Sequence, residues 1–380
     1  GFLFALKEGV FIENKQLRLL YRKPATSFNE KAVQQYNANR LSVIEEVVYE
    51  EGGRIDLVIF INGLALFAIE LKFNPSGQSV QDAIKQLKGR NPNNRLFRFE
   101  QGVLASFAVD TMEIYMTTQL KGQETYFLPF NMGKGEGIDM GSGNPHNPNG
   151  VDTEYLWLDV LTKDSILQLI ESFIFFELDK NDAKKRTLIF PRYHQRRAVS
   201  RLLEDMKVNH TDSNYLIQHS DGSGKTNTIA WLAHSLVSLH DDQNRNIVDT
   251  VLIVTDRIVV DRQLQDAVRQ IDHKNGVVKV MGDRETSSDL ADAIAGNTKI
   301  IATTIHKFAQ INQSNWMSVG NTAKKKFAIL IDEAHSSTTG SYMSSVSQVL
   351  TETDTEDGTI DEIQEVTVAD AIEQEIARTG

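Results

Sequence analysis

Apolar residues occur in short runs that predict strands in both halves of the chain. Residues 55–61 and 64–72 form two nearly continuous apolar runs. Asn62-Gly63 between them favours a tight hairpin turn, because both residues tolerate positive φ. Strands that are apolar on both faces are usually covered on both faces, as in an α/β layer. We therefore predict a β-hairpin inside a layered domain, followed by a helix that includes residues 83–87.

The second half of the chain alternates strand and helix patterns. Short apolar runs predict strands at residues 215–218, 251–255, 277–281, 299–303 and 327–332. Such alternation implies a parallel sheet with right-handed crossover connections. Between the two halves, the apolar positions of residues 161–178 recur at helical spacing and predict a helix that ends the first domain.

Composition places the chain among ordinary globular proteins. Of its 380 residues, 41% are hydrophobic and 24% are charged, and no apolar run approaches the roughly 18 residues of a transmembrane helix. The absence of cysteine excludes disulfides, thiolate metal sites and thiol catalysis, and it fits a reducing compartment. We therefore expect a cytoplasmic protein that does not act on a membrane.

The net negative charge of the chain does not exclude a nucleic-acid partner. A formal charge of −11 would argue against a nucleic-acid partner if it were spread evenly. Residues 351–380 contain ten acidic residues and one basic residue, a balance of −9, which leaves −2 for residues 1–350. The acidic segment thus accounts for most of the charge and lies outside the motifs described next.

A phosphate-binding loop is predicted at residues 219–226 (His-Ser-Asp-Gly-Ser-Gly-Lys-Thr), between a short apolar run and a helical pattern. In such loops the backbone N–H groups and the helix N-terminus surround phosphate, Lys225 reaches the β- and γ-phosphates, and Thr226 holds Mg²⁺. The candidate nucleotide-binding residues are Gly222, Ser223, Gly224, Lys225 and Thr226. Two features depart from the usual pattern: His219 replaces the first glycine, and Asp221 places a carboxylate near the phosphates.

A second motif ends the apolar run 327–332 with Asp332-Glu333-Ala334-His335. Ligands bind at the carboxyl ends of strands in open α/β sheets. We expect Asp332 to bind Mg²⁺ and Glu333 to orient or deprotonate the attacking water.

Two carboxylates and a lysine in the predicted hairpin suit metal-dependent phosphodiester cleavage. Asp56 lies on its first strand, and Glu70 and Lys72 lie on its second strand. Asp56 and Glu70 are candidate Mg²⁺ ligands and catalytic residues, and Lys72 is a candidate for stabilising developing negative charge. Taken alone this constellation is a weak signal, because strand ends often carry such residues.

The register of the hairpin tests this interpretation. A strict two-residue turn pairs Ile61 with Leu64 and places Asp56 opposite Ile69, so that Glu70 points to the other face. We therefore predict either a three-residue loop or a bulge, with Gly63 at positive φ. A two-residue register without a compensating bulge would contradict the nuclease interpretation.

The motor motifs resemble those of helicase superfamily 2. Residues 190–195 (Phe-Pro-Arg-Tyr-His-Gln) are similar to the segment with which such motors contact adenine, which implies that Gln195 reads the base edge. Two further segments are similar to motifs that contact the DNA backbone, which makes Arg257, Arg262, Thr304 and Lys307 candidate DNA contacts.

The hairpin resembles the Asp…Glu-x-Lys nuclease superfamily. In the following helix, Gln86 is similar to the glutamine of a Gln-x-x-x-Tyr element found in nucleases fused to DNA translocases, with Arg90 in place of the tyrosine. The resemblance makes Gln86 a further candidate catalytic residue and leaves the role of Arg90 open.

The order of nuclease before motor resembles the motor (R) subunit of type I restriction enzymes. The resemblance implies a restriction-endonuclease-like domain over 1–160, a helical linker over 161–185 and a RecA-like parallel-sheet domain over 186–380. It also implies ATP, Mg²⁺, double-stranded DNA, and a methyltransferase and a specificity subunit as partners in a bacterial or archaeal cytoplasm. The DNA target sequence cannot be read from this chain, because a separate subunit supplies it in that family.

Two alternatives remain open at this point. The chain could belong to another helicase-nuclease of DNA repair, or it could bind DNA or partners without catalysis if Asp221 disables the phosphate loop. No Ser/Thr-Ala-Thr-like motif follows Asp332, and no second motor domain with an arginine finger precedes Gly380. We therefore expect that this chain does not translocate DNA by itself.

Overall fold

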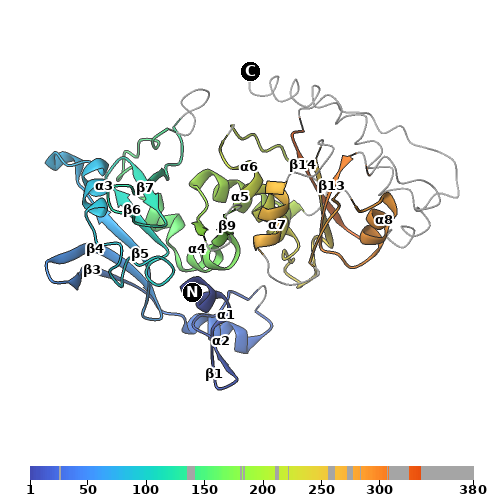
Figure 1. Ribbon diagram of the computed structural model, residues 1–380, viewed down its shortest axis with the longest axis horizontal. Coiled ribbons are helices and arrows are strands. Elements are labelled where there is room, and N and C mark those ends of the chain that lie inside the picture. The colour runs from blue at the N-terminus through green and yellow to red at the C-terminus, as the bar shows by residue number, and fades with distance from the viewer. Residues whose placement is uncertain are drawn as a thin grey trace. The chain divides into compact units, whose positions relative to one another are not determined.

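The protein forms two compact units (Figure 1). The computed structural model describes residues 1–24, 27–134, 142–179, 182, 185–209, 214–220, 222–255, 262–271, 277–282, 284–305, 307 and 325–334. The first unit comprises residues 1–200 with 242–244, and the second comprises residues 201–241 with 245–380. The two units are described separately below.

A six-stranded mixed sheet organises the first unit. Its strands, in spatial order, are β3 (Leu41–Glu50), β4 (Gly53–Ile61), β5 (Leu64–Leu71), β6 (Ala105–Val109), β7 (Ile114–Thr117) and β8 (Leu128–Pro129). Strands β5 and β6 are parallel and the other neighbours are antiparallel. The crossover between β5 and β6 contains η1 (Asn74–Ser76) and helix α3 (Val80–Lys88), as a parallel connection requires.

The hairpin of β4 and β5 contains both a two-residue turn and a bulge. Ile61 pairs with Leu64 across the turn, where Asn62 and Gly63 have φ of 51° and 81°. The register then shifts by one residue, so that Ile59 pairs with Phe67 and the strands continue in the new register. The bulge prediction is confirmed, and the alternative of a three-residue loop is wrong.

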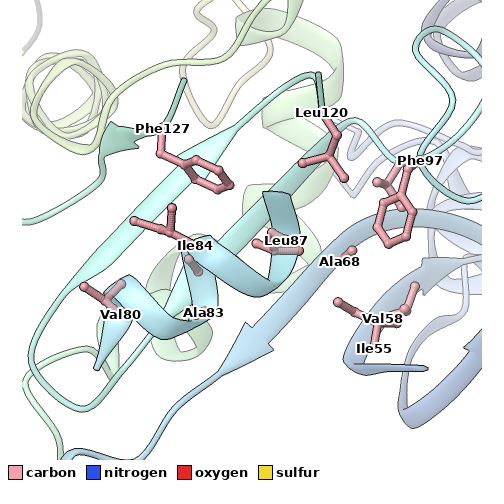
Figure 2. Close-up of a cluster of buried hydrophobic side chains, with 12 residues drawn as sticks. Ile55, Val58, Ala68, Val80, Ala83, Ile84, Leu87, Phe97, Leu120 and Phe127 are labelled. Atoms are coloured by element: carbon pink, nitrogen blue, oxygen red, sulfur yellow. The ribbon is translucent and has the colours of Figure 1, made fainter. Parts of the chain in front are cut away.

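Helix α3 covers one face of the sheet, where Val80, Ala83, Ile84 and Leu87 are buried (Figure 2). These side chains pack with Ile55, Val58, Ala68, Phe97, Leu120 and Phe127. A capping box in which Ser79 and Asp82 bond each other's backbone N–H begins the helix. The sequence expectation of a helix after the hairpin is confirmed, and the helix brings its carboxyl-terminal end to the β4–β5 hairpin.

Aromatic side chains fill the opposite face of this sheet. Phe67 and Phe107 point away from α3, and their rings contact that of Phe190 edge-to-face at 6.0 and 5.9 Å. Phe130 joins the same cluster. Both faces of β5 are therefore covered, as the apolar runs predict.

The remaining elements of the first unit surround this sheet. They are α1 (Phe2–Glu8), β1 (Val10–Ile12), β2 (Lys15–Leu17), α2 (Glu30–Ala38), η3 (Leu156–Val160), α4 (Lys163–Gln168), η4 (Leu169–Phe173), β9 (Phe175–Leu178) and β10 (Arg186–Ile189). Helix α5 (Tyr193–Asn209) begins in this unit. Residues 161–185, which we expected to form a helical linker, contribute α4, η4 and β9 to it.

Asp110, buried at the end of β6, joins the crossover to the sheet. Its carboxylate accepts hydrogen bonds from the backbone N–H groups of Val80, Met112 and Glu113 at 2.7–2.8 Å and from the side chain of Asn74 at 2.9 Å. We expect Asp110→Ala to lower the free energy of unfolding by about 3–5 kcal/mol, because one buried and three part-buried donors would lose their acceptor. Urea unfolding followed by circular dichroism measures this loss. Asp110→Asn should lower the free energy of unfolding by less than Asp110→Ala does. A loss below about 1 kcal/mol in Asp110→Ala would contradict the role of Asp110 in joining the crossover to the sheet.

A four-stranded parallel sheet organises the second unit, in the order β12 (Val278–Val280), β13 (Ile300–Thr304), β11 (Thr250–Thr255) and β14 (Phe327–Asp332). Helices α6 (Lys225–Leu236) and α7 (Arg262–Ile271) lie on one side of it and α8 (Ser287–Ala295) on the other (Figure 1). Four of the five predicted strands are present. The described part of the chain is thus α/β, with a mixed sheet followed by a parallel one.

Two predicted elements differ from the structure. Residues 214–220 form no strand, and the side chains of Tyr215, Leu216 and Ile217 are exposed. An apolar run becomes a strand only when a neighbour pairs with it, and none of the strands in the described part of the chain does so. The helix predicted over 161–178 ends at Phe173, because β10 pairs with residues 175–178 as an antiparallel strand.

Within the described ranges, no helix combines the length and the apolar character needed to cross a membrane.

Candidate functional site

The bulge in the β4–β5 hairpin brings the predicted nuclease residues to one face. With Leu57 opposite Ile69, the continued register places Asp56 opposite Glu70. The Asp56 carboxylate accepts a hydrogen bond from the backbone N–H of Leu71 at 2.7 Å. Lys72 Nζ lies 3.1 Å from Glu70 Oε1 and 4.0 Å from Asp56 Oδ2. The structure therefore assembles Asp56, Glu70 and Lys72 as the sequence predicts.

Glu70 is fully buried, and its charge state depends on its neighbours. Burial raises the pKa of the Glu70 carboxyl, and the carboxylate of Asp56 raises it further. Hydrogen bonds from Lys72 and Arg90 act in the opposite direction and favour the ionised form. The two cations thus offset part of the cost of burying this carboxylate.

Arg90 also belongs to this site, although the sequence alone left its role open. Its Nη2 donates to Glu70 Oε2 at 3.0 Å, and its Nη1 donates to the hydroxyl of Tyr49 on β3, also at 3.0 Å. Tyr49 is fixed in turn by an edge-to-face contact with Phe97. The pKa of the Arg90 guanidinium is raised, because bonding and charge from Glu70 and Tyr49 outweigh the opposing effect of burial. The position of Arg90 four residues after Gln86 was the only signal in the sequence.

A pocket of about 430 Å³ lies beside these residues. Its polar side chains come from Arg54, Asp56, Gln86 and Arg90, and residues 48, 52 and 53 complete the lining. Gln86 is exposed on α3 and faces this pocket. The predicted catalytic residues Asp56 and Gln86 therefore share one cavity.

The two carboxylates suit a magnesium ion by chemical type, but both oxygens of the buried Glu70 are bonded to Lys72 and Arg90, so a metal would have to displace one of these cations. Mg²⁺ retains several water ligands and is usually held by one or two protein carboxylates together with substrate phosphate. Asp56 and Glu70 supply two carboxylates in this arrangement. Across the described residues, no group of three or more His, Asp or Glu side chains forms a larger metal cluster.

The phosphate loop of the second unit has the backbone that its glycines predict. Gly222 and Gly224 have φ of 70° and 86°, and α6 begins directly after Gly224, at Lys225. The Ser223 hydroxyl donates to the carbonyl of Ser220 at 2.5 Å, and its oxygen lies 3.3 Å from Nδ1 of His219. The loop therefore presents a helix N-terminus, which is a site for anions. Asp221 lies outside the described residues.

The lysine of this loop contacts the acidic motif of β14. Lys225 Nζ lies 2.9 Å from Glu333 Oε1, and both side chains are about one-third exposed. Asp332 ends β14 opposite Thr255 of β11, and Glu333 follows it with φ of 56°. Two motifs separated by more than 100 residues in the sequence thus meet at the carboxyl edge of the parallel sheet.

The other predicted motor residues are placed as follows. Gln195 is buried in the first turn of α5, where its side-chain oxygen accepts from the backbone N–H of Arg192 at 2.9 Å. Thr304 is buried at the end of β13. Lys307 donates to the carbonyl oxygens of Met281, Gly282 and Glu285, so a phosphate contact would require it to leave them. Its role as a DNA contact stays a prediction.

Several predicted residues cannot be placed. Arg257 and His335 lie outside the described residues. Arg262 begins α7, but its side chain is outside the described part. The DNA contacts expected of Arg257 and Arg262 therefore stay predictions.

Comparison with known proteins finds a matching family model for each of the two regions that contain the sites. Residues 7–125 match the family model of the type I restriction enzyme R protein N terminus, and residues 194–355 match that of the SWI2/SNF2 ATPase. The chain resembles type I restriction endonuclease subunits. Both models match in the order that the motifs predict, and each includes one of the sites described above.

Individual relatives support the same resemblance. A provisionally named type I restriction enzyme endonuclease subunit of Methanocaldococcus jannaschii is 27% identical over 312 residues, which cover 78% of this chain and 28% of that protein. Type I restriction enzyme endonuclease subunits of Staphylococcus aureus and Staphylococcus saprophyticus are 26% and 25% identical over 307 residues, which cover 80% of this chain and 30% of theirs. The chain thus spans less than one-third of the length of these relatives.

Proposed function

We propose that the chain carries the nuclease and the first motor region of an ATP-dependent type I restriction endonuclease subunit. The observation that supports this most strongly is the bulged hairpin, which sets Asp56 opposite the buried Glu70 and Lys72. A strict two-residue register would have separated these side chains. The same chain also contains the Lys225–Glu333 pair of a nucleotide site.

In this proposal the hairpin cuts DNA. Mg²⁺ held by Asp56 and Glu70 would polarise a DNA phosphate and lower the pKa of a water molecule. Lys72 supplies positive charge to the phosphate as negative charge develops on it. Gln86 lies at the pocket wall, where its amide can position the DNA or the attacking water.

The motor residues act on ATP. Lys225 and the backbone N–H groups of residues 222–226 bind the phosphates, and Thr226 and Asp332 hold Mg²⁺. Glu333 orients the attacking water, and Gln195 contacts the adenine edge. The position of Lys225 at the N-terminus of α6 and its proximity to Glu333 support the roles assigned to Lys225 and Glu333.

The proposed partners are double-stranded DNA and the methyltransferase and specificity subunits of a type I complex, in the cytoplasm of a bacterium or archaeon. The names of the relatives support an assembly of this kind. In this assembly the motor moves DNA while the specificity subunit supplies the recognition sequence.

The complete subunit, assembled with the methyltransferase and specificity subunits of its own operon, tests this function. We expect ATP hydrolysis that requires double-stranded DNA, and cleavage of circular plasmid that requires both ATP and Mg²⁺. Omission of ATP or chelation of Mg²⁺ with EDTA should each prevent cleavage. Cleavage that proceeds without ATP would refute the proposed coupling of motor and nuclease.

A further inference from the structure

The pocket beside the nuclease residues has the lining of an anion site. Arg54 and Arg90 contribute two guanidinium groups, Gln86 contributes an amide, and the lining carboxylate is that of Asp56. Asp56 is already assigned to the metal pair and bonded to the Leu71 N–H. The polar groups that remain for a ligand are therefore two guanidinium cations and one neutral amide, all of which can donate hydrogen bonds.

Arg90 has donors that its two hydrogen bonds to the protein do not use. Each of its two terminal nitrogens donates one of its two hydrogens, to Glu70 or to Tyr49, and its buried Nε has no hydrogen-bond partner. A buried donor without an acceptor is unfavourable, and native structures usually provide one. A ligand oxygen in the pocket that Arg90 lines can instead accept from the second N–H of a terminal nitrogen, because Nε itself is buried.

Arg54, near the start of β4, also lines the pocket. Its Nε lies 2.5 Å from Oε2 of Glu46, and their side chains are 65% and 55% exposed. Ion pairs this exposed contribute little to stability, so Arg54 can exchange Glu46 for a phosphate at small cost. Arg54 can therefore contact a ligand without disturbing the fold.

The backbone near Arg54 is strained at Glu46. Glu46 lies between the paired residues 45 and 47, opposite Asp56, and has φ of 52° in the middle of a strand. Such conformations are strained for a residue with a side chain and cluster at functional sites. Gly52 at the hairpin turn has φ of 71°, and nothing lies within 4 Å of the place where a Cβ would be. The space next to Gly52, which lines the pocket at the turn between β3 and β4, is therefore open.

We propose that this pocket binds a phosphodiester of the DNA strand next to the phosphate that is cut. Arg54, Arg90 and Gln86 donate to its oxygens, while Asp56 and Glu70 serve the neighbouring phosphate through Mg²⁺. The pocket volume of about 430 Å³ is in the range of small-ligand sites and can admit one phosphate with its sugar. This inference rests on the proposed nuclease function and adds to it a second, metal-independent contact with the substrate.

DNA binding by this 380-residue chain tests the pocket directly. Fluorescence anisotropy of a labelled DNA duplex is measured in EDTA, where no metal contributes, over a series of salt concentrations. Each phosphate contact adds about 0.9 to the slope of log K against log salt. We expect Arg54→Gln to reduce the slope by about 0.9 and to weaken binding about three- to tenfold at low salt.

Arg40→Gln is the matched control. Arg40 is an exposed arginine that precedes β3, at the end of this strand opposite the turn that leads to Arg54. Arg40→Gln should leave both the affinity for DNA and the slope of log K against log salt unchanged. Arg54→Lys should retain the wild-type slope. Equal effects of Arg54→Gln and Arg40→Gln would overturn the proposal, as would an unchanged slope in Arg54→Gln.

A parallel assay separates this proposal from the nuclease function. Mg²⁺-dependent cleavage by the complete complex is compared for Glu70→Gln and the wild type. If Glu70→Gln cleaves normally, the nuclease assignment fails while the salt slope of Arg54→Gln still reports the phosphate contact. If Glu70→Gln is inactive and Arg54→Gln has the wild-type slope, the pocket proposal fails alone.

Discussion

Replacing Glu70 by glutamine in the complete subunit is expected to reduce Mg²⁺-dependent DNA cleavage by about 10²–10³-fold while ATP hydrolysis stays within about twofold of the wild type. Glutamine keeps the size of the side chain but removes the charge that would hold the metal. Its amide also cannot accept from both Lys72 and Arg90 as the carboxylate does. Plasmid cleavage and phosphate release, measured on the same preparation, give the two values.

Two further variants make this prediction specific. Lys72→Ala should lose cleavage to a similar extent, because it removes the cation beside Glu70. Glu124→Gln removes an exposed carboxylate elsewhere in the first unit and should retain both activities. Loss of ATP hydrolysis in Glu70→Gln would show that the two sites are not separate and would refute the assignment.

Replacing Lys225 by alanine is expected to reduce ATP hydrolysis by about 10²–10³-fold and, with it, the cleavage that depends on translocation. Lys225 is the cation at the N-terminus of α6, and its Nζ lies 2.9 Å from Glu333 Oε1. Alanine removes the charge that would bind the β- and γ-phosphates. Phosphate release and triplex displacement on long linear DNA measure hydrolysis and translocation.

Glu333→Gln distinguishes the two functions assigned to this pair. It should bind ATP but hydrolyse it slowly, because Lys225 remains to bind phosphate while the group that orients water is lost. Lys225→Ala should instead weaken ATP binding, which a fluorescent nucleotide analogue can measure. Wild-type hydrolysis in either variant would contradict the assignment of this edge of the sheet as the nucleotide site.

Local sequence patterns determined most of the strands. The runs at 55–61 and 64–72 became β4 and β5, and Asn62-Gly63 formed the turn, because an apolar run and a turn dipeptide act over a few residues. The run 215–218 has the same local character but is not a strand, since pairing depends on a neighbour that is distant in sequence. Periodicity therefore indicates where a strand can form, and the sheet decides whether it does.

Arg90 shows the limit of motif reasoning at the nuclease site. Its place in a Gln-x-x-x-Arg segment gave no indication that it would bond Glu70 or that Tyr49 would hold it from β3. These three residues belong to separate elements, and only the packing of α3 on the sheet brings them together. Lys307 shows a second limit. Its ammonium group donates to backbone carbonyl oxygens, and because every residue has a carbonyl group, no sequence pattern predicts these contacts.

The sequence by itself determined the two candidate sites, their order along the chain and the need for either a three-residue loop or a bulge between Asp56 and Glu70. These follow from residue types at short spacing and from the two-residue period of a strand. Only the tertiary structure decided where the register shifts, that Arg90 joins Glu70, and that Lys225 meets Glu333 across more than 100 residues. The physical reason is that these contacts depend on side-chain packing between elements that are distant in the chain, and such packing leaves no local pattern in the sequence.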